Sequence, residues 1–148
     1  MWTTPNFSII NLMRSEYSDS GVGASRILVC DDSPPERTAL AEILRRQGYD
    51  VDEAADGASA LLLLKAPTHD LLLLDLQMPN VDGFDVLAYV QRHRPELPVV
   101  LLSGLPPDEI GDGMQRLPVP ELPPLLMKPI NSRQLFQVIE LKLAGEIP

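Results

Sequence analysis

Residues 71–79 read LLLLDLQMP, in which four leucines precede a single carboxylate, Asp75, and Pro79 closes the stretch. Consecutive apolar residues bounded by acids, here Asp70 and Asp75, are typical of a parallel strand that is buried on both faces. A buried segment of a helix is the alternative interpretation, because so short a run shows no clear period. If residues 70–75 form a strand, Asp75 ends it and its carboxylate lies at one edge of a sheet.

Four more short apolar runs predict the other strands. Residues 26–30, 98–102 and 125–127 are largely continuous apolar runs, whereas residues 49–54 alternate as an edge strand does. Between these runs, apolar residues at helical spacing predict helices over residues 34–47, 58–65, 83–94 and 132–143. The alternation implies βαβ units with right-handed crossovers, and therefore an α/β fold with a five-stranded, doubly wound parallel sheet.

Local signals mark both ends of the first predicted helix. Ser33 and Pro34 suit its start, and Glu36 completes a capping box in which the Ser33 side chain caps the first turn. Gly48 suits its C-terminal stop. The helix therefore begins directly after a pair of acids, Asp31 and Asp32.

Polar side chains follow the predicted strands at their carboxyl ends. Asp31 and Asp32 follow the first strand, Asp75 ends the third, Ser103 follows the fourth and Lys128 follows the fifth. Ligands of open α/β sheets bind at this edge. We therefore expect these five side chains to line one crevice.

The residues expected in this crevice favour phosphoryl chemistry. Three carboxylates repel one another, and Mg²⁺ suits such a site because it prefers oxygen ligands and commonly bridges carboxylates to phosphate oxygens. Aspartate is a nucleophile toward phosphoryl groups, and such transfers depend on positioning and charge neutralisation. The Lys128 ammonium and the Ser103 hydroxyl can each bind a phosphate oxygen. A serine after a strand also often caps a turn, and this alternative stays open for Ser103.

The segments VCDD, LLLLDLQMPNVDG, LLSG and MKP occur in the order and approximate spacing of response-regulator receiver domains, which residues 26–145 resemble. The resemblance implies a flavodoxin-like sheet of strand order 2-1-3-4-5. It implies that Asp75 is the phosphoacceptor and that Lys128 and Ser103 contact the phosphoryl group. It also implies a Mg²⁺ site formed by Asp31, Asp32, Asp75 and the backbone carbonyl of Gln77.

The same resemblance implies a phosphohistidine donor, either a histidine kinase or a histidine phosphotransfer protein, and a downstream protein target that stays unknown. The chain is then a signalling phosphoacceptor and not a turnover enzyme, since receivers catalyse only their own phosphorylation and slow dephosphorylation. Two alternatives stay open: a phosphorylation-independent receiver-like scaffold, and a Mg²⁺-dependent phosphohydrolase with an aspartate nucleophile. Such hydrolases place a second aspartate two residues after the nucleophile as general acid, where this chain has Gln77.

The chain departs from the receiver pattern around its fourth helix. Residues 105–124 should contain that helix but hold six prolines and two glycines. Proline costs roughly 3 kcal/mol and glycine roughly 1 kcal/mol in a helix interior, so we expect the fourth helix to be degenerate. Leu125 stands where receivers usually carry an aromatic residue, and Gly104 replaces the usual alanine. We infer signalling through another surface or through ordering of this segment.

One further expectation concerns the turn after Asp75. Asp82 and Gly83 match the receiver family's loop after the phosphoacceptor, where the chain bends back sharply. We expect Gly83 to have a positive φ angle, because glycine adopts such angles without steric cost.

Bulk properties exclude several function classes. The 148 residues include 45% hydrophobic residues and carry a net charge of −9, which argues against nucleic acid as a partner. The leucine runs are far shorter than the roughly 20 apolar residues of a membrane span, and no signal peptide is evident. The single cysteine, Cys30, suits a reducing compartment, so we expect a cytoplasmic protein with no membrane partner. We expect residues 1–25 to form an N-terminal tail or linker.

Overall fold

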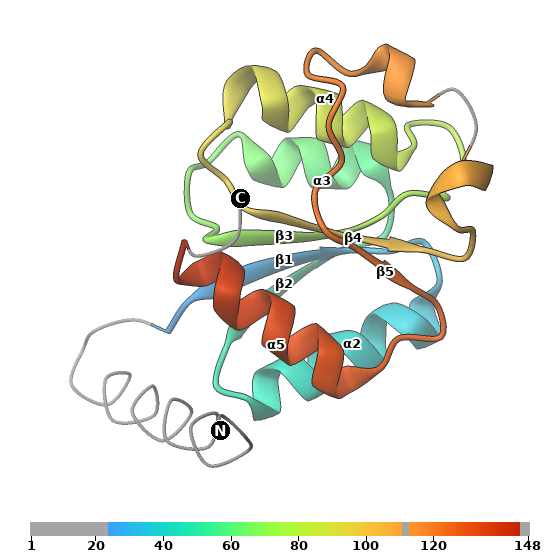
Figure 1. The fold of residues 1–148 in the computed structure, drawn as a ribbon. Helices are drawn as coiled ribbons and strands as arrows, with labels where there is room; N and C mark the ends of the chain where they lie inside the picture. Colours follow the sequence, from blue (N-terminus) through green and yellow to red (C-terminus); the bar gives the residue numbers. More distant parts are fainter. Residues whose placement is uncertain (1–23, 111–112, 146–148) are drawn as a thin grey trace.

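The computed structural model describes residues 24–110 and 113–145 and contains a five-stranded parallel sheet with strand order β2-β1-β3-β4-β5 (Figure 1). This is the predicted order 2-1-3-4-5. The strands are β1 (Arg26–Cys30), β2 (Asp50–Ala54), β3 (Leu71–Asp75), β4 (Val99–Ser103) and β5 (Leu125–Met127). The helices are α2 (Pro34–Arg46), α3 (Gly57–Leu64), α4 (Gly83–His93) and α5 (Ser132–Leu143).

The leucine run forms the central strand β3 and not a helix. Leu72 pairs with Leu28 in β1 and with Val99 in β4, so β3 has a neighbour on each side. Leu72 and Leu74 pack in the core under α3 and α4, whereas Leu71 and Leu73 pack in the core on the side of α2 and α5. Figure 1 shows these two pairs of helices on opposite faces of the sheet. Because both faces are covered, the strand is apolar at successive positions.

The start of α2 differs from the predicted capping box. Ser33 is the N-cap residue, but its side chain makes no capping hydrogen bond. Its backbone N–H donates to Oδ1 of Asp31 at 2.9 Å, and the Glu36 carboxylate lies 3.3 Å from Nζ of Lys128. The predicted capping box is therefore wrong, because nearby charged side chains bind the groups that it requires. The predicted stop is confirmed, since Gly48 has a φ of 96°.

Gly83 is required for close approach and not for its φ angle. Among the described residues, only Gly48 and Gly145 are glycines with positive φ, so this expectation for Gly83 is wrong. A Cβ at position 83 would lie 2.5 Å from the backbone oxygen of Asp75. The turn instead contains Asn80, with a φ of 62°. Gly83 thus lets α4 begin directly against the end of β3.

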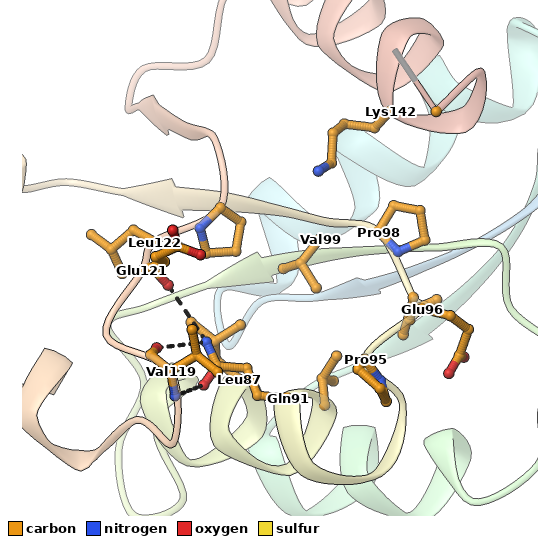
Figure 2. Close-up of a pocket in the computed structure, with 14 residues that line it drawn as sticks. Leu87, Gln91, Pro95, Glu96, Pro98, Val99, Val119, Glu121, Leu122 and Lys142 are labelled. Atoms are coloured by element: carbon orange, nitrogen blue, oxygen red, sulfur yellow. Dashed lines mark hydrogen bonds between the residues drawn. The ribbon is translucent and has the colours of Figure 1, made fainter. Parts of the chain in front are cut away.

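The fourth receiver helix is absent from the described part of residues 105–124. Two 3₁₀ turns occur there, η1 (Pro107–Glu109) and η2 (Gly113–Arg116), as the prolines predict. We call residues 113–124 the strap. It is fixed to α4, because the Gln91 side chain exchanges two hydrogen bonds with the backbone of Val119, at 2.9 and 3.0 Å (Figure 2). Leu117 packs into the core beneath the strap.

Two expectations concern parts of the chain other than the sheet. Among the described residues, no helix has the length and apolar character to cross a membrane. The predicted tail or linker, residues 1–25, lies almost entirely outside the described residues and stays a prediction.

Candidate functional site

The carboxyl ends of the strands bring four of the five predicted side chains together. Asp31 follows β1, Asp75 ends β3, and Lys128 follows β5. One carboxylate oxygen from each of Asp31, Asp32 and Asp75 lies within 4.8 Å of the other two. The side chains of Asp31 and Asp75 are buried, whereas Asp32 is exposed to solvent. The acids therefore form a cluster that is open on one side.

This acidic cluster fits a hard divalent cation. All its donors are oxygens, and Mg²⁺ binds oxygen ligands at roughly 2.1 Å, which places neighbouring ligands roughly 3 to 4 Å apart. The observed spacing within 4.8 Å needs only small side-chain movements to reach that arrangement. Because Asp32 is exposed, water molecules can complete the coordination, as Mg²⁺ usually requires.

Lys128 is the cation of the cluster. Its ammonium nitrogen lies 3.1 Å from Oδ2 of Asp75, 3.4 Å from Oδ2 of Asp31 and 3.3 Å from Oε1 of Glu36. Burial opposes its charge, but the hydrogen bond to Asp75 and the nearby carboxylates together hold the pKa of Lys128 above its ordinary value. Its backbone N–H donates to the carbonyl of Ser103 at 2.7 Å, which fixes the lysine to the end of β4.

The Asp75 carboxylate has a shifted pKa. Burial raises the pKa of Asp75 to about 6, although hydrogen bonds from Lys128 and from the Gln77 backbone act in the opposite direction. The Gln77 N–H donates to Oδ1 of Asp75 at 3.0 Å, so the two carboxylate oxygens have different partners. A buried carboxylate with a raised pKa at the end of a central strand is a frequent feature of reactive sites.

Ser103 lies at the same edge, but its hydroxyl contacts other groups. Its Oγ lies 2.6 Å from the carbonyl of Leu105 and 3.2 Å from Oε1 of Gln77, and it accepts the Leu105 N–H at 2.9 Å. Gln77 Oε1 also accepts the backbone N–H of Gly104 at 2.9 Å. The hydroxyl thus acts as a turn cap, which was the alternative for this serine. Ligation of a metal by the Gln77 carbonyl stays a prediction.

Sequence reasoning missed two side chains of the site. The Gln77 side chain joins the loops after β3 and β4, and Glu36 is a further carboxylate beside Lys128. Glu36 could have been found from its position, because it lies in the first turn of the helix that directly follows the two acids. The apparent capping box assigned it a local partner instead. No comparable signal exists for the Gln77 side chain, whose partners are distant in sequence.

Two cavities differ in their relation to this cluster. A cavity of about 450 Å³ lies at the opposite edge of the sheet, between α4, the strap and the start of β4, and includes Leu87, Val99 and Leu122 (Figure 2). None of the predicted site residues lines it. A cavity of about 260 Å³ is lined by Lys128 and Glu36 and otherwise by apolar residues, namely Ala39, Leu40, Ile43, Pro129 and Ile130. Of these two cavities, the smaller one therefore adjoins the cluster.

Comparison with known proteins identifies the family of the chain. The model of the response regulator receiver domain matches residues 27–140. A solved receiver domain from Methanospirillum hungatei, described as CheY-like, superposes with a TM-score of 0.74 at 26% identity and covers 84% of this chain and 97% of that one. A CheY4 chemotaxis protein from Vibrio cholerae gives a TM-score of 0.69 at 25% identity, over 80% of this chain and 98% of that one.

Relatives found by sequence are longer than this chain. The transcriptional regulatory protein TcrA of Mycobacterium tuberculosis is 35% identical over 132 residues, which make up 86% of this chain and 49% of TcrA. The sensor protein EvgS of Escherichia coli O157:H7 is 44% identical over 73 residues, 49% of this chain and 6% of EvgS. The chain thus spans half or less of the length of these relatives. The family match over residues 27–140, the strand order and the receiver-like solved structures agree: this chain belongs to the response regulator receiver domains of two-component signalling.

Proposed function

We propose that this receiver accepts a phosphoryl group from a phosphohistidine donor on Asp75, with Mg²⁺, and thereby changes its binding to a protein partner. The observation that carries this proposal is the position of the Asp75 carboxylate. It lies 3.1 Å from the Lys128 ammonium and shares an oxygen cluster within 4.8 Å with Asp31 and Asp32. We extend the proposal to residues 26–145 as the receiver unit.

Each residue of the site has a distinct role in this proposal. Asp31, Asp32, Asp75 and the backbone carbonyl of Gln77 would hold Mg²⁺, which when bound neutralises negative charge on the carboxylates and phosphoryl oxygens. Lys128 supplies a second positive charge for a phosphoryl oxygen, and its raised pKa keeps it protonated. Ser103 donates to another oxygen after its hydroxyl leaves the carbonyl of Leu105.

The transfer itself is a displacement at phosphorus. An Asp75 carboxylate oxygen forms the new P–O bond while the P–N bond to the donor imidazole breaks, and the electron pair of that bond stays on the imidazole nitrogen. Asp75 must be ionised to attack, so its pKa of about 6 permits the reaction at neutral pH. The donor imidazole leaves as a neutral base when its other ring nitrogen carries a proton, so the receiver supplies position and charge and contributes no general acid.

The cavity beside Lys128 supports a protein donor. It has a volume of about 260 Å³, and Ala39, Ile43 and Ile130 give it an apolar lining next to the reactive edge. An apolar side chain of a histidine kinase or histidine phosphotransfer protein can fill such a cavity while its phosphohistidine reaches Asp75. Receiver domains pair with histidine kinases as a family. We infer that this pairing takes place in the cytoplasm, because the buried free thiol of Cys30 suits a reducing compartment.

The phosphohydrolase alternative lacks its general acid. Gln77 occupies the position two residues after Asp75, and its Oε1 is engaged by Ser103 and Gly104. An amide does not transfer a proton in that role. The phosphorylation-independent scaffold draws support from Leu125, which replaces the usual aromatic residue and packs against the core under α4. Mass measurement distinguishes the hydrolase and the scaffold from the phosphoacceptor.

Intact mass measurement after incubation with a small phosphodonor and Mg²⁺ tests the proposal. We expect a mass increase of one phosphoryl group for the native chain, none for Asp75→Asn, and the native result for the control Asp108→Asn, which changes an exposed aspartate in η1. Sustained turnover of the donor would favour the hydrolase. Absence of any mass change, with small and phosphohistidine donors alike, would favour the scaffold.

A further inference from the structure

Lys128 is shared among three carboxylates, and one of them has no role in the proposed reaction. Asp31 and Asp75 are the buried pair, at 0% and 2% exposure. Glu36 approaches from the first turn of α2, with Oε1 3.3 Å from the ammonium and a side chain that is 49% exposed. It is therefore a solvent-facing negative charge at the entrance to the phosphoacceptor.

The charge of Glu36 opposes an approaching phosphoryl group. A cation at the acidic cluster offsets the charges of Asp31 and Asp75, whereas Glu36 has Lys128 as its neighbour, and this lysine must turn to a phosphoryl oxygen. Once Lys128 does so, the Glu36 carboxylate faces the incoming anion directly. Among the described residues, Glu36 and Lys128 are also the only charged ones that line the cavity of about 260 Å³ beside the site.

We propose that Glu36 is a specificity-determining residue that disfavours dianionic phosphodonors and favours a donor protein with a cationic side chain beside its phosphohistidine. This inference rests on the proposed function of Asp75. The donor's Arg or Lys would take over the pairing that Lys128 gives up, while an apolar neighbour fills the adjacent cavity. An acidic residue in the same place of the donor would face Glu36 across a few ångströms and weaken the encounter.

Two small donors of different charge isolate this effect. Near pH 7, acetyl phosphate is a dianion and phosphoramidate is mainly a monoanion, because the nitrogen of phosphoramidate carries an extra proton. In each case Asp75 forms the new P–O bond. The leaving group departs with the electron pair of the broken bond, as acetate when a P–O bond breaks and as ammonia when a P–N bond breaks. Both reactions use the same residues, so their rate ratio reports the charge near the phosphoryl group.

The experiment compares this rate ratio in variants of the full chain at saturating Mg²⁺ and low ionic strength. Glu36→Gln should raise the ratio of acetyl phosphate to phosphoramidate rates by roughly threefold to tenfold, and Glu36→Lys should raise it further. The matched control is Glu42→Gln, which removes the same charge from the same helix at a residue that pairs with Arg46. Salt should shrink the effect of Glu36→Gln, because ions screen the partly exposed carboxylate.

Synthetic phosphohistidine peptides test the partner chemistry. The native chain should react faster with a peptide that has Arg next to phosphohistidine than with one that has Glu there, and Glu36→Gln should reduce this preference by roughly threefold or more. An unchanged donor ratio in Glu36→Gln, or an equal rise in Glu42→Gln, would overturn the inference while Asp75 phosphorylation stands. Failure of the native chain to react with any donor would overturn both proposals.

Discussion

Asp75 is a deeply buried residue that carries a negative charge, and burial of this charge lowers the free energy of unfolding. The side chain is 2% exposed, and Lys128 at 3.1 Å is its cationic partner. Burial raises its pKa to about 6 from an ordinary value of 3.8, so the folded protein binds a proton here more tightly than the unfolded chain does. When the pH is above both pKa values, the charge of Asp75 destabilises the metal-free fold. When the pH is below both, Asp75 is protonated in the folded and the unfolded state, and this destabilisation disappears.

Asp75→Asn should therefore stabilise the protein in the presence of a chelator. We expect the free energy of unfolding to rise by about 1 to 3 kcal/mol near pH 8 and the gain to shrink as the pH falls through about 6 toward 4. Urea unfolding at several pH values measures this gain.

Asp32→Asn is the control for this measurement, since it removes the same charge from an exposed member of the cluster. Asp32→Asn should raise the free energy of unfolding by less than Asp75→Asn does. A stability change for Asp75→Asn that is negative near pH 8, or that does not vary with pH, would contradict the burial argument.

At the scale of single residues, the sequence predicts which side chains meet in the acidic cluster better than it predicts their further partners. Asp31, Asp75 and Lys128 could be predicted because each lies at the carboxyl end of a strand, and parallel strands bring these positions to one edge. The sequence places Glu36 in a capping box, a motif whose partners lie within three residues of each other. Its partner Lys128 comes from the far end of the chain, so no rule based on nearby residues could assign it.

At the scale of elements, β3 is predicted by its own residues, whereas the path of the strap depends on distant contacts. The leucine run predicts β3 by itself, because a strand covered on both faces needs apolar residues at every position. The prolines of residues 105–124 predict the loss of a helix but not the path of the chain that remains. That path depends on tertiary contacts, namely Gln91 with Val119 and Arg116 with Asp82 at 2.8 Å.

The strap should behave as part of the folded core. Leu117 is 7% exposed and packs with the core under α4, whereas Val119 is 45% exposed. We expect Leu117→Ala to lower the free energy of unfolding by about 2 kcal/mol, through lost burial and a residual cavity, and Val119→Ala to change it by less than about 0.5 kcal/mol. Urea unfolding of both variants, followed by circular dichroism, provides the comparison. Equal stability of the two variants would show that the strap does not contribute to cooperative folding.

At the scale of the whole molecule, the acidic cluster and the strap lie in different parts of the fold. The carboxyl edge of the sheet holds the acidic cluster and Lys128, and the strap covers the face of α4 at some distance (Figure 1). The loop after β4 joins them, because Ser103 and Gly104 bind the Gln77 side chain near Asp75 and the chain then continues through η1 toward the strap. The hydrogen bonds of the Gln77 side chain therefore connect the surroundings of Asp75 to the loop after β4.

A phosphoryl mimic should alter this loop first. If the Ser103 hydroxyl turns to an oxygen or fluorine at Asp75, the Leu105 N–H loses the acceptor that it now has at 2.9 Å. Beryllofluoride with Mg²⁺ should therefore speed amide exchange at Leu105 by roughly threefold or more, with smaller changes in the strap. Residue-resolved exchange by NMR measures this. The Ser59 N–H is the internal control, since it also donates to a side chain, Asp56 at 2.7 Å, but on α3. If shifts near Asp75 prove that the mimic is bound while exchange at Leu105 stays unchanged, the signal leaves the site by another route than this loop.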